Sequence, residues 1–158
     1  MDTKKILVAY YSRTGITKTV SNKIRQLLNC DIEEIIDTKN RKGILGYISA
    51  GYSALKGSLT EIIEPKFDPS DYDIIIIGTP VWAGRISNAV RTYISKNAGK
   101  IKNIMVFCTQ SGEGKNKVCN DIKEYYGREP LAALTITGKQ MKDGSYQNEL
   151  AKFIEASK

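Results

Sequence analysis

The chain has 158 residues, 41% of them hydrophobic and 26% charged, and a formal net charge of +7, which fits one ordinary globular domain over residues 1–158. It contains no histidine, and its three cysteines, Cys30, Cys108 and Cys119, include no Cys-x-x-Cys pair. The absence of histidine excludes imidazole-based catalysis, and the cysteine spacing argues against a disulfide framework, a zinc site or an iron–sulfur cluster. We therefore expect no metal site, and we expect a bound organic cofactor to supply any demanding chemistry.

Five apolar, β-rich runs alternate with helical patterns along the chain. The predicted strands are Lys5–Tyr11, Asp31–Ile36, Asp73–Thr79, Lys102–Thr109 and Leu131–Thr137. The predicted helices are Ile16–Leu28, Ser87–Ala98, Lys115–Tyr126 and Tyr146–Ala156. The continuous run Ile74–Ile77 is typical of a central parallel strand that is covered on both faces. This alternation predicts an α/β fold with a parallel sheet and right-handed crossovers.

The first strand is followed by a turn, Ser12-Arg13-Thr14-Gly15-Ile16-Thr17, that opens the first helix. The first-turn amides of a helix lack internal partners, and the helix dipole favours an anion there. Gly15 permits a close backbone approach, and Ser12, Thr14 and Thr17 carry hydroxyl groups that can donate hydrogen bonds. The turn therefore predicts a site for a phosphorylated ligand.

The segment Asn40–Glu64 interrupts the regular alternation. Its apolar residues recur at spacings of three and four, which predicts a helix in part of it: Ile44, Leu45, Ile48, Tyr52, Leu55 and Leu59. Four glycines weaken that helix: Gly43, Gly46, Gly51 and Gly57. We interpret the segment as the covering crossover that a parallel connection needs, with a flap over the ligand as the alternative.

Two further turns follow strands that end at the same edge of a parallel sheet as the first. They are Thr79-Pro80-Val81-Trp82-Ala83-Gly84-Arg85 and Thr109-Gln110-Ser111-Gly112-Glu113-Gly114. Trp82, the single tryptophan, can stack on a planar ring or serve as a half-buried core anchor, and we favour stacking. The small residues of the Thr109–Gly114 turn let backbone amides reach the polar edge of a ring.

These three turns, with the number of strands and the order of the motifs, resemble the flavodoxin family of FMN-binding electron carriers. The resemblance covers nearly the whole chain and implies a doubly wound, five-stranded parallel sheet with strand order 2-1-3-4-5. It implies that the FMN phosphate is bound by Ser12, Arg13, Thr14, Gly15 and Thr17, with Ile16 in the same turn. It implies that one side of the flavin ring is lined by Thr79, Pro80, Val81, Trp82, Ala83 and Gly84. It implies that the pyrimidine edge is approached by Thr109, Gln110, Ser111 and Gly112.

The chain departs from the flavodoxin pattern in several respects. Ile16 stands where flavodoxins usually carry asparagine, and no tyrosine lies between Thr109 and Asn120 to cover the outer face of the ring. Electron-carrier flavodoxins are typically acidic, whereas this chain is basic, which implies partners with acidic docking surfaces. Arg85 either lies near the flavin or is a solvated residue at the start of a helix.

We predict an FMN-dependent redox protein that carries electrons between partner proteins. The alternative is an FMN-dependent enzyme that oxidises NAD(P)H and reduces a quinone. Small size and the lack of a nicotinamide-binding domain favour the carrier, whereas the basic charge and an open ring face favour the enzyme. A P-loop nucleotidase is poorly supported, because no Gly-Lys-Ser/Thr follows the first strand.

The charge and the chain start bear on partners and location. The positive charge fits an acidic partner, and a lysine-rich solvated surface explains it equally well. The lysines are dispersed and no recognition motif is present, so we expect no nucleic-acid partner. No apolar stretch approaches the roughly 20 residues that span a bilayer. The first residues lead into a predicted strand without a signal-peptide pattern, which predicts a cytoplasmic protein.

Overall fold

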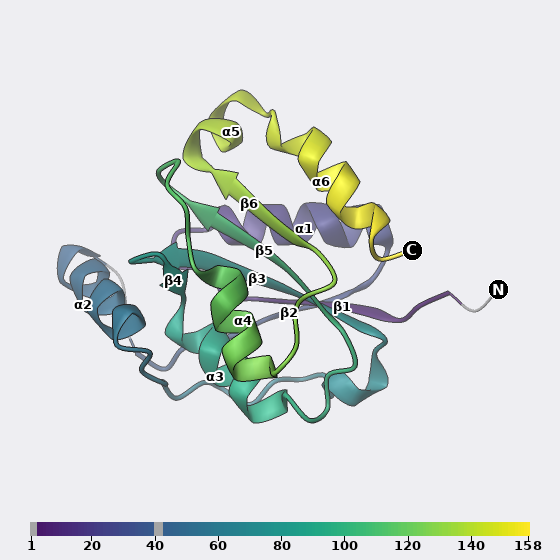
Figure 1. The fold of residues 1–158 in the computed structure, drawn as a ribbon, viewed down its shortest axis with the longest axis horizontal. Helices are drawn as coiled ribbons and strands as arrows, with labels where there is room; N and C mark the ends of the chain where they lie inside the picture. Colours follow the sequence, from purple (N-terminus) through teal and green to yellow (C-terminus); the bar gives the residue numbers. More distant parts are fainter. Residues whose placement is uncertain (1–2, 40–42) are drawn as a thin grey trace.

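The computed structural model describes residues 3–39 and 43–158, which form a sheet with helices on both faces (Figure 1). The strands are β1 Ile6–Tyr10, β2 Asp31–Glu34, β3 Ile74–Trp82, β4 Arg85–Ile86, β5 Ile104–Gln110 and β6 Ala133–Thr137. The helices are α1 Ile16–Leu28, α2 Gly43–Leu55, α3 Asn88–Asn97, α4 Val118–Tyr126, α5 Gly138–Asp143 and α6 Tyr146–Glu155, with a 3₁₀ turn at Pro69–Asp71.

Five strands form a parallel sheet in the order β2-β1-β3-β5-β6. Strand β4 lies off this path and pairs antiparallel with the end of β3. Counted over the parallel strands alone, the order is therefore 2-1-3-4-5, and the α/β fold class is confirmed. The register aligns Val8 with Ile76 and Ile76 with Met105, so β1, β3 and β5 end side by side at one edge of the sheet.

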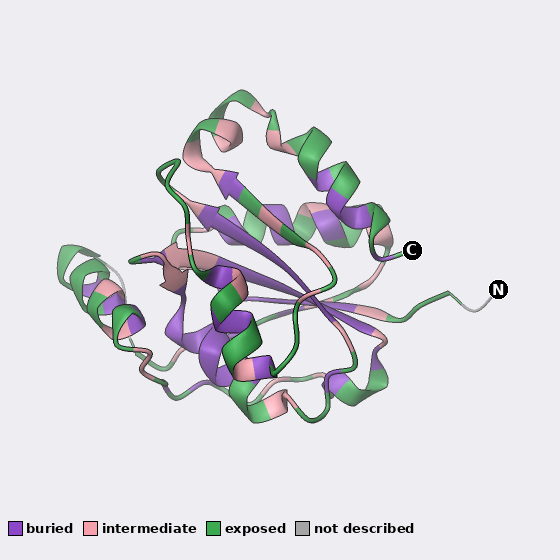
Figure 2. Ribbon diagram, in the orientation of Figure 1, coloured by how far each residue is buried: buried purple, intermediate pink, exposed green. Residues whose placement is uncertain are grey.

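The sheet separates two apolar layers, because successive side chains of a strand point to opposite faces. In β3, Ile75 and Ile77 belong to the layer that contains α3 and α4, whereas Ile74 and Ile76 belong to the layer of α1 and α6. All four are buried, as Figure 2 shows for the central strands. The expectation of a strand covered on both faces is confirmed.

Close packing at the centre of the sheet requires Gly78 in β3. A Cβ atom at this position would lie 2.5 Å from Cζ of Phe107 and 2.9 Å from Cβ of Tyr10. Both neighbours are buried, so neither can move aside without opening the tightly packed interior. Gly78 therefore lets the Phe107 ring cover β3 just before the strand reaches the edge where the predicted turns begin.

The segment predicted as a turn at residues 79–85 is instead the end of β3, a two-residue connection and β4. Ala83 and Gly84 have φ angles of 51° and 77°, as in the type I′ turn that joins tight hairpins. Alanine rarely adopts a positive φ, so the residues carried no recognisable hairpin signal. The hairpin holds Trp82 opposite Arg85 at the edge of the sheet.

The connection from β2 to β3 contains α2, which stands at the end of the sheet beside β4 (Figure 1). Residues 40–42 of the Asn40–Glu64 segment lie outside the described residues. The predicted helix is present, it contacts β3, β4 and α3, and its buried positions are Gly46, Ala50 and Ala54. Its large apolar side chains are exposed. Within the described ranges, no helix is both long and apolar enough to cross a membrane.

Candidate functional site

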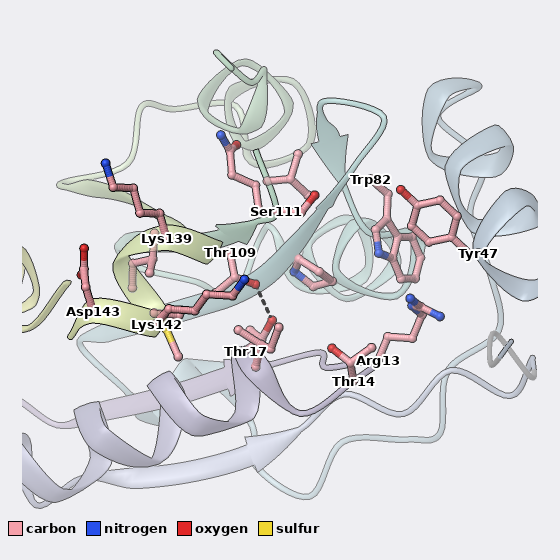
Figure 3. A pocket seen from close by; sticks show the side chains of 17 residues that line it. Arg13, Thr14, Thr17, Tyr47, Trp82, Thr109, Ser111, Lys139, Lys142 and Asp143 are labelled. Atoms are coloured by element: carbon pink, nitrogen blue, oxygen red, sulfur yellow. Dashed lines mark hydrogen bonds between the residues drawn. The ribbon is translucent and has the colours of Figure 1, made fainter. Parts of the chain in front are cut away.

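A cavity of about 880 Å³ opens at the carboxyl edge of the sheet (Figure 3). Open parallel sheets bind their ligands at this edge. The predicted site residues that line the cavity are Arg13, Thr14, Ile16, Thr17, Pro80, Val81, Trp82, Thr109, Gln110 and Ser111. The structure adds lining residues that the sequence analysis missed, namely Tyr47, Ile136, Gly138, Lys139, Met141, Lys142 and Asp143.

The turn before α1 presents a helix N-terminus to the cavity. Gly15 precedes the helix with a φ of 97°, which side-chain-bearing residues rarely adopt, and its amide donates to Oγ of Ser12 at 3.0 Å. No side chain within residues 3–39 and 43–158 caps α1, and its first turn holds no acidic residue. This N-terminus therefore keeps its attraction for an anion. Ser12 and Gly15 shape the turn without lining the cavity.

Two hydroxyl groups meet at the floor of the cavity. Oγ1 of Thr17 and Oγ1 of Thr109 lie 2.9 Å apart in a buried hydrogen bond, drawn as the dashed line in Figure 3. Each hydroxyl carries one hydrogen, so one group donates to the other and the accepting group still has its own hydrogen to donate. The bond joins the start of α1 to the end of β5 and fixes the distance between the first and third turns.

One wall of the cavity is aromatic. Trp82 packs edge-on against Tyr11, with ring centroids 5.4 Å apart and planes at 87°, and only 6% of Trp82 is exposed. Tyr47 of α2 lies next to Trp82 in Figure 3, and the guanidinium of Arg13 lies 5.3 Å from the Tyr47 ring centroid. Trp82 is thus both an anchored core residue and a cavity wall. No signal near the three turns pointed to Tyr47; only the flap alternative for its segment did.

Three predicted residues around the second turn do not line the cavity. Thr79 lies on the same face of β3 as Ile77, against α3, because side chains alternate along a strand. Its buried Oγ1 accepts a hydrogen bond from the Ser87 amide at 3.1 Å. Ala83 and Gly84 form the tip of the β3–β4 hairpin.

Arg85 is held by α4 and does not line the cavity. Its Nε donates to Oδ1 of the buried Asp121 at 2.6 Å, and its Nη2 lies 3.7 Å from a carboxylate oxygen of Glu124. The hydrogen bond with Asp121 raises the pKa of the Arg85 guanidinium. Asp121 also accepts from the Ile86 amide at 3.0 Å. Arg85 is therefore a partly buried ion-pair partner that fixes the hairpin to α4.

The third turn is organised by the side chains of Gln110 and Asn116. Nε2 of Gln110 donates to the carbonyls of Gly112 and Gly114 at 2.9 and 2.6 Å. Nδ2 of Asn116 donates to Oε1 of Gln110 at 2.9 Å, and its Oδ1 accepts from the Val118 amide at 3.1 Å. Gly112 is thereby part of the turn but not of the cavity lining. The predicted helix Lys115–Tyr126 therefore starts too early, because α4 begins at Val118. Asn116, two residues before this start, was the missed signal, because asparagine side chains close local turns.

The wall opposite Trp82 comes from α5, which the sequence analysis did not predict. The helix begins with a capping box in which the Thr137 amide donates to Oε1 of Gln140 at 2.9 Å and the Gln140 amide donates to Oγ1 of Thr137 at 3.3 Å. The Thr-x-x-Gln pattern is a known helix start and could have revealed α5. Gly138 lies against the third turn, since a Cβ there would be 3.2 Å from the Ser111 carbonyl oxygen.

Cations outnumber carboxylates around the cavity. The charged residues of its described lining are Arg13, Lys139, Lys142 and Asp143. Figure 3 shows the two lysines on the α5 side and Arg13 on the α2 side. A cavity with this balance attracts anionic ligands.

Cys108 lies beneath the third turn and is buried. Its Sγ lies 3.3 Å from Oγ1 of Thr135, and burial raises the pKa of the thiol to about 11. A thiol that stays protonated at neutral pH is a poor nucleophile. Cys108 is therefore a small buried side chain of the core.

Comparison with known proteins connects this arrangement to one family. The family model described as Flavodoxin matches residues 5–157. The chain is similar to the structure of a flavoprotein in complex with FMN from Lactobacillus acidophilus NCFM, with 22% identity, a TM-score of 0.74, and coverage of 90% of this chain and 99% of that chain. It is also similar to oxidised Flavodoxin 1 from Bacillus cereus, with 16% identity, a TM-score of 0.55 and coverage of 96% and 97%. It is also similar to two-electron reduced flavodoxin from Megasphaera elsdenii, with 15% identity, a TM-score of 0.58, and coverage of 96% of this chain and 97% of that chain.

Proposed function

The chain belongs to the flavodoxin family, and we propose that it carries electrons between partner proteins. Its cofactor is FMN, which accepts and donates one or two electrons when it is bound. The observation that carries the proposal is the cavity at the carboxyl edge of the sheet, which combines an uncapped helix N-terminus with an aromatic wall. The positive surface charge supports partners with acidic docking surfaces.

The donors around the cavity fit a phosphorylated ligand. A phosphate suits the N-terminus of α1, where Gly15 keeps the backbone accessible and Thr14 borders the cavity. Ile16 offers no side-chain donor, so backbone amides and hydroxyl groups would hold the phosphate. The volume of about 880 Å³ falls within the roughly 300–1,000 Å³ of pockets that bury small molecules.

The aromatic wall fits the planar part of the same ligand. Trp82 is fixed by Tyr11, so it can present a rigid apolar surface without losing side-chain freedom on binding. Tyr47 supplies from α2 an aromatic side chain that the third turn lacks. Since Arg13 lies over the Tyr47 ring, the phosphate turn and the aromatic wall are in direct contact. An apolar wall disfavours additional negative charge beside it, because it solvates an anion poorly.

The third turn fits the polar edge of the ring. Gln110 and Ser111 line the cavity, but the side-chain amide of Gln110 is engaged by two carbonyls of its own turn. Its backbone groups are therefore the ones that would bind a ligand. Thr109 is held by Thr17 at the cavity floor, which fixes the position of these backbone groups.

One observation favours a second function, that of an FMN-dependent NAD(P)H:quinone-type oxidoreductase. The cavity continues past the third turn to α5, where Lys139 and Lys142 are placed to bind the phosphates of a nicotinamide dinucleotide. The carrier is preferred because the described residues form one sheet with its covering helices, with no second domain for a dinucleotide.

An anaerobic challenge of the FMN-loaded protein with NADH or NADPH separates the two functions. A carrier keeps its yellow absorbance for many minutes, whereas bleaching within seconds supports the enzyme. The double variant Lys139→Gln, Lys142→Gln should slow bleaching only if the enzyme is correct. Equilibrium dialysis against FMN should give one FMN per chain, and a chain that takes up none contradicts both functions.

A further inference from the structure

Helix α2 leaves its large apolar side chains exposed. We call this surface the α2 outer face, made up of Ile44, Leu45, Tyr47, Ile48, Tyr52 and Leu55. The exposed fractions of these residues run from 59% to 84%, and Figure 2 shows most of α2 as exposed. Small residues face the body instead: Gly46, Ala50 and Ala54. Surface helices of globular proteins normally show the opposite arrangement, with the large apolar residues toward the core.

The α2 outer face is broad and uninterrupted. With 3.6 residues per turn, its side chains cover roughly 160° of the helix circumference, as much as a stripe that packs against a core. The helix Gly43–Leu55 contains no charged residue. Contiguous apolar surfaces of this kind mark sites of interaction with proteins or membranes.

Cations border the α2 outer face near both of its edges. The Arg13 guanidinium lies 5.3 Å from the ring centroid of Tyr47, and Nζ of Lys56 lies 4.7 Å from that of Tyr52. The two tyrosines are five residues apart, which places them near opposite edges of the stripe. Tyrosines and basic side chains at the boundary of an apolar surface are typical of residues at the level of lipid headgroups.

We propose that α2 docks the protein on an anionic lipid surface. The aliphatic side chains of the α2 outer face insert among the acyl chains, and its two tyrosines lie at the level of the headgroups. Arg13 and Lys56 contact the negatively charged headgroups. Because Tyr47 belongs both to this face and to the cavity lining, docking places the cavity mouth at the lipid surface. Docking through α2 goes beyond electron transfer and does not depend on which acceptor the protein uses.

Charge and shape favour lipid over the other occupants of such a face. A second copy would bring Arg13 and Lys56 of both chains together, and each chain already carries a net charge of +7. A protein partner would need a groove that fits a projecting helix, since α2 stands out at the end of the molecule (Figure 1). A bilayer surface accepts such a helix without a matching shape.

Sedimentation of the full FMN-loaded chain with lipid vesicles tests the proposal. Vesicles of mixed phosphatidylglycerol and phosphatidylcholine should bind the protein at least about tenfold more tightly than phosphatidylcholine alone, because two cations contact the headgroups. Added salt should weaken the binding to anionic vesicles, because exposed charges are screened. No binding of the wild type to either vesicle overturns the proposal.

Three variants separate insertion from simple charge attraction. Leu45→Glu should weaken binding to anionic vesicles at least about tenfold, because it places a charge in the apolar face. Lys56→Glu should weaken it by a factor of about five and leave binding to phosphatidylcholine unchanged. Leu131→Glu is the matched control, since Leu131 is 53% exposed just before β6 and should bind as the wild type does.

Other outcomes assign the face differently. Equal binding of the wild type and Leu45→Glu to anionic vesicles would attribute binding to net charge alone and overturn the proposal. A concentration-dependent dimer in analytical ultracentrifugation that Leu45→Glu abolishes, without vesicle binding, would assign the face to a second copy. Circular dichroism and FMN content check that Leu45→Glu is folded, and Ile48→Ser serves as a second, milder variant.

Discussion

Helices α2 and α3 are successive α-helices of the chain, separated by β3 and β4, and they contact each other. Helix α3 buries its large side chains, whereas α2 exposes them. Helix α3 buries every residue from Asn88 to Ile94, whereas α2 buries only Gly46, Ala50 and Ala54. The sequence of α2 is the more apolar of the two. Hydrophobicity alone therefore does not place a helix in the core. A stripe of small residues determines which side of α2 can approach the body closely.

The contact between these helices depends on a buried arginine. Nη2 of Arg91 donates to the Ala54 carbonyl at 3.1 Å, and its Nη1 donates to the Ser58 carbonyl at 3.1 Å. Nδ2 of Asn88 donates to the same Ser58 carbonyl at 2.8 Å. Side chains of α3 thus donate to carbonyls in the last turn of α2 and just after it, where few helix amides are available. Burial lowers the pKa of Arg91, which stays charged because arginine titrates far above neutral pH.

The largest expected effect contrasts two isoleucines, one on each helix. Ile94→Ala on α3 should lower the free energy of unfolding by about 2–5 kcal/mol, because it leaves a cavity in the core. Ile48→Ala on the exposed face of α2 should change it by no more than about 0.5 kcal/mol. Urea denaturation followed by circular dichroism measures both. Equal losses would mean that α2 is packed as α3 is.

The next effect concerns the small residues that face the body. Ala50→Leu should lower the free energy of unfolding by about 1–3 kcal/mol, because the added side chain has no space beneath α2. Ser49→Leu, one position away on the exposed side, is the control and should be nearly neutral. Urea denaturation again gives the values. If both variants are neutral, α2 does not pack closely on its neighbours.

Two tyrosines of α2, Tyr47 and Tyr52, are expected to differ in their effect on FMN binding. Tyr47→Ala should weaken FMN binding by a factor of about 3–10, as expected for one aromatic contact of roughly 0.5–1.5 kcal/mol. Tyr52→Ala should leave the affinity unchanged, since Tyr52 lies on the α2 outer face and not in the cavity lining. Isothermal titration calorimetry of the two apo variants measures the difference. Identical affinities would remove Tyr47 from the binding site.

The smallest effect depends on pH and arises from a contact of α3. Oη of Tyr93 donates to Oε1 of Glu33 at 3.4 Å, and the amides of Lys66 and Phe67 donate to Oε2 at 3.0 and 3.2 Å. Burial nevertheless raises the pKa of Glu33 above its ordinary value of 4.5. The folded state therefore holds this proton more tightly than the unfolded state. The stability that Glu33 contributes is complete below pH 4.5 and declines as the pH rises through its folded-state pKa.

The variant Glu33→Gln isolates this pH dependence. The free energy of unfolding of the wild type minus that of Glu33→Gln should decrease from acidic pH to neutral pH. Urea titrations at a series of pH values measure the difference. Tyr52→Phe on α2 is the control and should show no such change, because α2 contains no charged side chain. A difference that grows with pH would contradict the raised pKa.

The sequence predicted those elements whose buried residues form a continuous apolar run or recur at a helical spacing. The run Ile74–Ile77 and the helix Ile16–Leu28 are of this kind, and both were placed correctly. A spacing of three and four residues also located α2. It could not tell whether the apolar face points inward or outward, because both give the same periodicity.

The cavity could be predicted only in part for similar reasons. Its first and third turns follow from the rule that ligands bind where parallel strands end. The hairpin at Ala83 depends on a positive φ that alanine seldom adopts, and α5 is too short for a periodic signal. Tyr47 reaches the cavity from a different connection, so only the three-dimensional arrangement shows its position.

Trp82 is the single tryptophan of the chain, and it lies in the cavity wall against Tyr11. An indole at this position emits light in the near-ultraviolet range, where a neighbouring flavin absorbs. If FMN occupies the cavity as proposed, we expect this emission to be quenched, and to recover when FMN is removed. The fluorescence of Trp82 would therefore report cofactor occupancy in real time, without any added dye.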